Sequence, residues 1–179
     1  MIIFTFMKDF IGKLDFYIRN YNLEEELYKN GSIIKRRGHF TKQEFLLICL
    51  WKSRRPKRHY LKNTESQVKR ITKAALSCKD EKEKIKILIQ LKGVAIPTAT
   101  ALLSVADPTR YPIIDVRCVK SLNDLQLIKW KAINFSNWLE YLEIIRKMAK
   151  SKKKTARNIE KGLFAYNRIK LDQVYKNLY

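Results

Sequence analysis

Cysteine and histidine are scarce in this chain of 179 residues. The three cysteines, Cys49, Cys78 and Cys118, stand far apart, and His39 and His59 are the two histidines. An odd number of thiols without a C-x-x-C pair argues against a disulfide framework and against a zinc or iron–sulfur site. We therefore expect reduced, structural thiols, no metal ligands and a cytosolic setting.

Long hydrophobic runs are also missing. No apolar run approaches the roughly 20 residues that a membrane-spanning helix needs, and the apolar opening, residues 1–7, is too short for a signal-peptide core with its cleavage site. The sequence predicts a protein without a membrane partner. We expect it to be cytoplasmic, and nucleoid-associated if the source is a prokaryote.

Acidic residues are few, with 17 Asp and Glu against 38 Lys and Arg, so the net charge is +21. A hydrophobic fraction of 46% is typical of a folded domain with a real core. So much like charge repels itself in a compact state, and a polyanion is the expected partner. Charge alone fits nucleic acid, a membrane surface or a ribosome.

What the chain does have is helical periodicity, interrupted by helix-capping and helix-breaking residues. No stretch alternates like a strand. Caps are predicted where Thr41, Thr64 and Asp80 precede Glu44, Gln67 and Glu83. The sequence predicts an all-α fold with helices over residues 1–20, 23–28 (ended by Asn30-Gly31), 45–51, 64–76, 81–91, 97–106, 116–122, 137–150 and 157–171. Residues 52–60 are predicted to form a basic loop broken by Pro56.

The stretch from residue 91 to residue 122 is the most informative. Gly93 is expected to end one helix, and Pro97 suits the first turn of the next. A turn of the form L-x-G-V between two helices leaves backbone N–H groups unpaired at the start of the second helix. With the positive end of the helix dipole, these groups can bind a phosphate, and glycine lets the nucleic-acid backbone come close.

This stretch resembles the helix-hairpin-helix motif L-x-G-V-G-x-x-T-A, and the downstream string PIIDVR at residues 112–117 extends the match. Together they resemble the endonuclease III-like superfamily of DNA glycosylases over about residues 41–122. The resemblance implies a two-lobed helical fold with the active cleft between the lobes. It also implies that a damaged or mismatched base is flipped out of duplex DNA and its N-glycosidic bond is hydrolysed. Asp115 falls at the family's catalytic aspartate, which would stabilise positive charge on the sugar and orient a water.

The expected organisation is a single compact unit of two lobes, as the resemblance implies. Residues 40–125 form a central lobe with the hairpin, and residues 1–39 plus 126–179 form the second lobe. We expect a monomer that binds double-stranded DNA. No organic cofactor and no iron–sulfur cluster is implied, whereas a structural monovalent cation at the hairpin carbonyls would fit the family.

Two departures from the family pattern bear on the chemistry. Family members that also nick the strand carry a Schiff-base lysine at the position of Pro97, so we expect a monofunctional glycosylase without lyase activity. Ala95 replaces the second hairpin glycine, which is expected to weaken the grip on phosphate.

The remaining site residues are predicted in two groups, and each has a structural alternative. A cap would look the same as a catalytic carboxylate at Asp115, and the hairpin could be an ordinary helical turn. The residues expected to bind the DNA backbone are Lys92, Gly93, Val94, Ala95, Thr98 and Arg117. The candidates for a base pocket or a wedge are Trp51, Arg54, Tyr60 and Tyr111, any of which could instead be packing residues or phosphate contacts.

Two other functions fit the same sequence. A non-catalytic helix-hairpin-helix DNA-binding protein would keep the fold without the chemistry. A basic RNA-binding or ribosome-associated protein would explain the charge alone.

Overall fold

The computed structural model describes residues 2–21 and 25–176, and within these ranges every regular element is a helix. The all-α expectation is confirmed. No helix in these ranges is long and apolar enough to cross a membrane. The helices are α1 (Ile2–Gly12), α2 (Leu14–Arg19), α3 (Glu25–Tyr28), α4 (Gly31–Arg37), α5 (Lys42–Lys52), α6 (Lys57–Tyr60), α7 (Glu65–Ser77), α8 (Glu81–Leu88), α9 (Ile96–Ala106), α10 (Val116–Asp124), α11 (Phe135–Lys152) and α12 (Ala156–Lys176).

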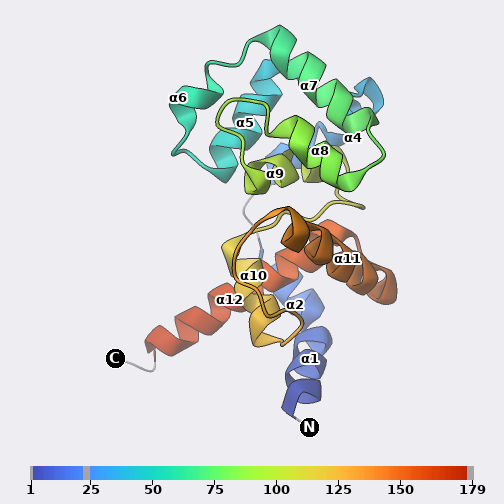
Figure 1. Ribbon diagram of the computed structural model, residues 1–179. Coiled ribbons are helices and arrows are strands. Elements are labelled where there is room, and N and C mark those ends of the chain that lie inside the picture. The colour runs from blue at the N-terminus through green and yellow to red at the C-terminus, as the bar shows by residue number, and fades with distance from the viewer. Residues whose placement is uncertain (1, 22–24, 177–179) are drawn as a thin grey trace.

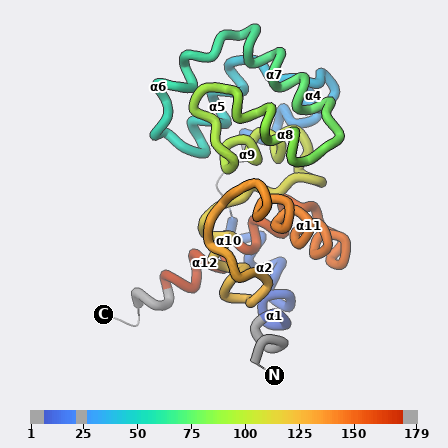
Figure 2. The backbone as a smooth tube through the Cα atoms, viewed as in Figure 1, coloured from blue at the N-terminus to red at the C-terminus, as the bar shows by residue number. Residues whose placement is uncertain are grey.

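The helices gather into two groups (Figure 1). Helices α4 to α9 form one group, called here the central lobe, and they follow one another along the chain (Figure 2). Helices α1, α2, α10, α11 and α12 form the other group, the terminal lobe, so it combines both ends of the chain. Helix α10 packs on α12, and α4 packs on α9. Residues 31–39 thus lie with the central lobe and residues 116–125 with the terminal lobe, a shift from the predicted division at 40 and 125.

Local capping signals set several helix starts. Thr41 Oγ1 accepts a hydrogen bond from the Glu44 amide (3.2 Å), and the Thr41 amide donates to Glu44 Oε2 (2.9 Å), which completes a capping box. Thr64 and Gln67 repeat this arrangement at the start of α7. The carboxylate of Asp80 caps α8 through the Glu83 amide at 2.7 Å. The predicted capping boxes at Thr41 and Thr64 are confirmed, whereas Asp80 makes one of the two bonds of the predicted box.

Two segments differ from the prediction. Helix α3 ends at Tyr28, just before Asn30-Gly31 as expected, but the helix that follows was not predicted: Gly31 begins α4, which ends at Arg37 and is capped by Gly38 with φ of 75°. A Cβ on Gly31 would lie 2.4 Å from the carbonyl oxygen of Val105, so glycine is needed here for the close approach of α4 to α9. The basic segment 52–60 was expected to be a loop, but it contains the short helix α6. Residues 22–24, which include the start of the predicted helix over residues 23–28, lie outside the described residues.

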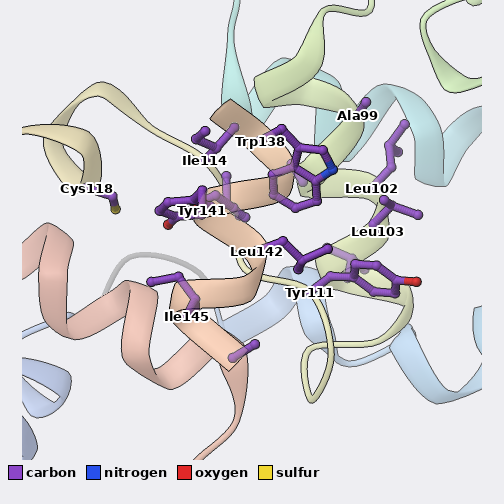
Figure 3. Packing of buried hydrophobic residues seen from close by; sticks show 14 of the residues in the cluster. Ala99, Leu102, Leu103, Tyr111, Ile114, Cys118, Trp138, Tyr141, Leu142 and Ile145 are labelled. Atoms are coloured by element: carbon purple, nitrogen blue, oxygen red, sulfur yellow. Dashed lines mark hydrogen bonds between the residues drawn. The ribbon is translucent and has the colours of Figure 1, made fainter. Parts of the chain in front are cut away.

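A shared apolar core joins the lobes. Trp138 of α11 is fully buried, and Figure 3 shows its ring beside Ala99 and Leu102 of α9. Tyr141 and Ile114, also buried, lie on the side of the terminal lobe. Burial of such large side chains contributes about 1.5–3 kcal/mol each to the free energy of unfolding. The two lobes are therefore held together by continuous apolar packing.

Candidate functional site

The two lobes enclose a cavity of about 420 Å³, called here the interlobe cleft. A volume of this size lies in the roughly 300–1,000 Å³ range of pockets that enclose small molecules. The central lobe contributes the last two residues of α5, and the terminal lobe contributes the start of α10 and the first half of α12. The lining residues are Tyr21, Trp51, Lys52, Ile113, Asp115, Val116, Arg117, Glu160 and Phe164.

Asp115 stands at the start of α10 and does two things at once. Its Oδ1 accepts a hydrogen bond from the Arg117 amide at 2.9 Å and so caps the helix. Its Oδ2 lies 2.5 Å from Nζ of Lys52, which comes from the other lobe. The structural reading of Asp115 as a cap is therefore correct, and the same carboxylate still faces the cleft, with 21% of its side chain exposed.

The backbone that carries Asp115 into the cleft is held from both lobes. The Ile114 amide donates to Oγ1 of Thr100 on α9 (3.2 Å), and the Tyr141 hydroxyl on α11 donates to the Ile113 carbonyl (2.9 Å). Buried hydrogen bonds of this kind fix geometry because leaving either partner unsatisfied costs about 1–3 kcal/mol. The carboxylate is consequently preorganised rather than carried on a free loop.

Charge in the cleft comes from a small set of side chains. Lys52, Asp115 and Arg117 line it, and the Arg117 guanidinium lies 5.4 Å from the centre of the Phe164 ring. Burial raises the pKa of the nearby Cys118 thiol and that of the Tyr141 hydroxyl, so both stay neutral at physiological pH. A ligand in the cleft would meet aromatic rings together with two basic and two acidic side chains, those of Lys52, Arg117, Asp115 and Glu160.

The turn between α8 and α9 is tightly packed. Gly93 has φ of 86°, and a Cβ there would lie 2.9 Å from the Tyr60 ring. Asn63 holds the turn from behind: its Oδ1 accepts from the Lys92 amide (2.8 Å), and its Nδ2 donates to the Lys92 carbonyl (3.0 Å). In the described part of the chain, the amides of Gly93, Ala95 and Ile96 donate to no protein acceptor.

The residues predicted for DNA-backbone binding do not all reach the surface. The side chain of Lys92 is exposed, and Gly93 is half-buried. Val94 and Thr98 are buried, so their side chains are turned away from any ligand. Ala95 is exposed with φ of −112°, an extended conformation open to any residue, so alanine replaces glycine here without backbone strain. Arg117 belongs to the cleft rather than to the turn.

The four candidates for a base pocket or a wedge also separate. Trp51 is half-buried and lines the cleft, whereas Arg54 is exposed beyond the end of α5. Tyr60 is fully buried, with its ring edge-on to Phe45, and so has no face free to stack on a base. Tyr111 is buried under the guanidinium groups of Arg110 and Arg146, away from the cleft. Tyr60 and Tyr111 are packing residues in this structure, which corrects their prediction as pocket or wedge candidates.

Three residues that line the cleft were not predicted from the sequence: Lys52, Glu160 and Phe164. Lys52 carried a local signal, because it follows Trp51 at the end of an apolar helix, but nothing nearby indicated that its partner lies far along the chain at Asp115. Among the described residues, no cluster of His, Cys, Asp or Glu side chains is arranged to hold a metal ion. The cation at the hairpin stays a prediction.

Comparison of the chain with protein-family models, with curated proteins and with solved structures finds no match.

Proposed function

We propose that this protein binds double-stranded DNA and removes a flipped base by cleaving its N-glycosidic bond, with Asp115 as the catalytic carboxylate. The observation that carries the proposal is the fixed carboxylate of Asp115 facing an interlobe cleft lined by aromatic side chains. A carboxylate in such a place can stabilise the positive charge that develops on the sugar as the base departs. Trp51 and Phe164 offer rings against which a base in the cleft can stack.

The DNA backbone would bind beside the cleft, at the turn between α8 and α9 acting as a helix-hairpin-helix. Three amides there lack protein acceptors, and the N-terminus of α9 adds its dipole. Helix α6 packs beneath Gly93 and brings exposed Lys57 and Arg58 next to the turn. Because the chain runs from Lys52 in the cleft through Arg54 to α6, one basic segment joins the cleft to the turn. Cationic side chains along this path favour a polyanion.

A base-release assay tests the proposal. Duplexes that carry oxidised, alkylated, deaminated or mismatched bases are incubated with the wild type and with Asp115→Asn. Asparagine is also a good N-cap, so the variant should fold and keep duplex affinity within a few-fold. Base release should fall about 10²–10⁴-fold, the usual range for a lost acid–base or charge-stabilising group.

The matched control is Asp80→Asn, which makes the same change at the exposed N-cap of α8. It should leave base release unaltered. Equal activity in Asp115→Asn and the wild type would refute the role of Asp115.

One observation favours a second function, a non-catalytic DNA-binding protein with the same fold. Both oxygens of Asp115 already have partners, one in the helix cap and one on Lys52, as in a purely structural residue. This reading predicts tight duplex binding, no base release from any substrate in the panel, and no functional change in Asp115→Asn.

A further inference from the structure

A second cavity, of about 510 Å³, lies in the terminal lobe between α10 and α12. It is called here the α10–α12 groove. Its walls are the face of α10 that carries Val116 and Lys120, the face of α12 that carries Asn167 and Leu171, and the side chain of Lys131. The volume lies in the roughly 300–1,000 Å³ range of small-molecule pockets. Val116 also lines the interlobe cleft, so the two cavities are neighbours.

Hydrogen bonds fix the walls of the groove. On the buried side of α10, Ser121 Oγ donates to the Leu163 carbonyl of α12 at 2.6 Å, which holds the two helices together. Asn123 Nδ2 donates to the Trp130 carbonyl at 2.8 Å and so fixes the residue before Lys131. A ligand would therefore enter a preformed site.

The groove carries an excess of positive charge. Three lysines line it, and one of them, Lys170, pairs with Asp124 at 2.9 Å. In the described part of the chain, the other two, Lys120 and Lys131, form no ion pair with an acidic side chain, and both are exposed. Two such ammonium groups favour a ligand with a phosphate or another anionic group.

A buried amide in the wall of the groove lacks a partner for its oxygen. Asn167 is only 4% exposed, and no group in the described ranges donates to its Oδ1. A buried acceptor without a donor is costly and rare in folded proteins. A ligand with an N–H group would supply the donor, whereas an acyl chain would leave the oxygen unpaired. The amide therefore favours a nucleobase over a lipid tail as the buried part of the ligand.

We propose that the α10–α12 groove binds a nucleotide, with its base between the two helices and its phosphate at Lys120 and Lys131. An N–H group of the base donates to Asn167 Oδ1, and the base packs against the apolar side chains of Val119 and Leu171. The phosphate accepts from the two ammonium groups. The nucleotide is either a free molecule or one unit of a strand that also reaches the neighbouring cleft.

Isothermal titration calorimetry with the full chain tests the proposal. The probes are AMP, GMP, CMP and UMP, a short single-stranded oligodeoxynucleotide, and ribose 5-phosphate, which has the sugar and the phosphate but no base. Because a net charge of +21 attracts any phosphate, ribose 5-phosphate measures the contribution of charge alone. At least one nucleotide should bind about tenfold more tightly than ribose 5-phosphate.

Asn167→Leu removes the acceptor and keeps a side chain of similar size. Affinity for the nucleotide should fall about fivefold, the fold-change for one neutral hydrogen bond, and affinity for ribose 5-phosphate should stay unaltered. Because the lost oxygen has no partner in the protein, the Tm of the variant should not fall. A lower Tm with unaltered nucleotide affinity would instead make Asn167 a structural residue and overturn the proposal.

Lys120→Gln removes one of the two unpaired charges. It should weaken the binding of both the nucleotide and ribose 5-phosphate by about fivefold. The matched control is Lys69→Gln, which removes the same charge from an exposed lysine of α7 and should change neither affinity by more than about twofold. This pair decides the matter if Asn167→Leu does not fold.

The probes also distinguish the two sources of the nucleotide. Mononucleotide binding that weakens in both groove variants would identify a free nucleotide as the occupant. If the mononucleotides bind no better than ribose 5-phosphate, but Asn167→Leu weakens binding of the oligonucleotide, the occupant is one unit of a strand. Affinities for all these probes that are the same in the wild type and in both groove variants would overturn the proposal. Asp115→Asn should bind the probes as the wild type does, so this test and the base-release assay can fail separately.

Discussion

Two ion pairs contribute to the wall of the interlobe cleft, and they differ in what surrounds them. Lys52 and Asp115 come from different lobes, and their side chains are 13% and 21% exposed. Arg157 and Glu160 are neighbours on α12, and their side chains are only 3% and 2% exposed. The Arg157 guanidinium also donates to the Tyr21 hydroxyl (2.9 Å) and lies 4.9 Å from the centre of that ring.

The difference separates a fully buried pair from a pair that faces the cavity. Burial lowers the pKa of the Arg157 guanidinium to about 10, which still leaves it charged at neutral pH. A buried charge of this kind needs its partners, because an isolated one costs several kcal/mol. Lys52 and Asp115 can instead exchange neighbours with an incoming ligand, since both face the cavity.

Arg157→Met should have the largest effect on stability. It leaves Glu160 buried without its cation, so the free energy of unfolding should fall by about 3–5 kcal/mol, measured by urea denaturation. The control is Lys147→Met, which breaks an exposed pair with Glu143 on α11 and should change stability by less than about 0.5 kcal/mol. A small loss in Arg157→Met would remove the distinction between the two pairs of the cleft.

The turn at Gly93 has a buried face, against the Tyr60 ring, and an exposed face. Gly93→Ala tests how closely the buried face is packed. The substitution forces a left-handed φ on alanine and brings Cβ against the Tyr60 ring. We expect a loss of about 1–3 kcal/mol in the free energy of unfolding. Gly12→Ala is the control, because a Cβ at Gly12 meets nothing within 4 Å. Equal stability of Gly93→Ala and the wild type would contradict the close packing of α6 under the turn.

A third ion pair, Lys35 with Asp107, is expected to have the smallest effect. Burial raises the pKa of the Asp107 carboxyl, but hydrogen bonds from Lys35 and Thr109 and the charges of Lys35 and Arg110 outweigh it, so the pKa lies below its usual value. A lowered folded-state pKa means that the stabilisation is present above about pH 4 and is lost as the pH falls through the folded value. Asp107→Asn should cost about 0.5–1 kcal/mol at pH 7. Unfolding measured across pH should show this difference shrinking below about pH 4, and a difference independent of pH would contradict the assignment.

Much of the fold could be predicted because its signals are local. Thr41, Thr64 and Asp80 mark helix starts through contacts with residues three positions on, which a sequence displays directly. Helix α4 was not predicted, because the need for glycine at its first residue, Gly31, is tertiary: the carbonyl of Val105 leaves no room for a Cβ. The buried position of Tyr60 could not be predicted either, since a four-residue helix has too few positions to define an apolar face.

Only the part of the candidate site that is continuous in sequence could be predicted. Asp115 and the turn at Gly93 lie in one continuous stretch of sequence, so both could be proposed as candidates from the sequence alone. Lys52 reaches the site from another helix and another lobe, and pairing across such a distance leaves no periodic signal. Tyr111 was an attractive candidate because it stands close to Asp115 in sequence, but packing under Arg110 and Arg146 turns it out of the cleft.

The different burial of two tryptophans provides built-in optical probes. Trp51 is half-buried on the wall of the cleft, whereas Trp138 is fully enclosed between α11 and α9. A nucleobase stacked on an indole quenches its fluorescence, so occupancy of the cleft would dim Trp51 and leave the emission of Trp138 unaltered. Loss of the packing between the lobes would instead shift the Trp138 emission to longer wavelength. With the third tryptophan, Trp130, replaced by phenylalanine, ligand entry and separation of the lobes could thus be followed as two independent signals without an added label.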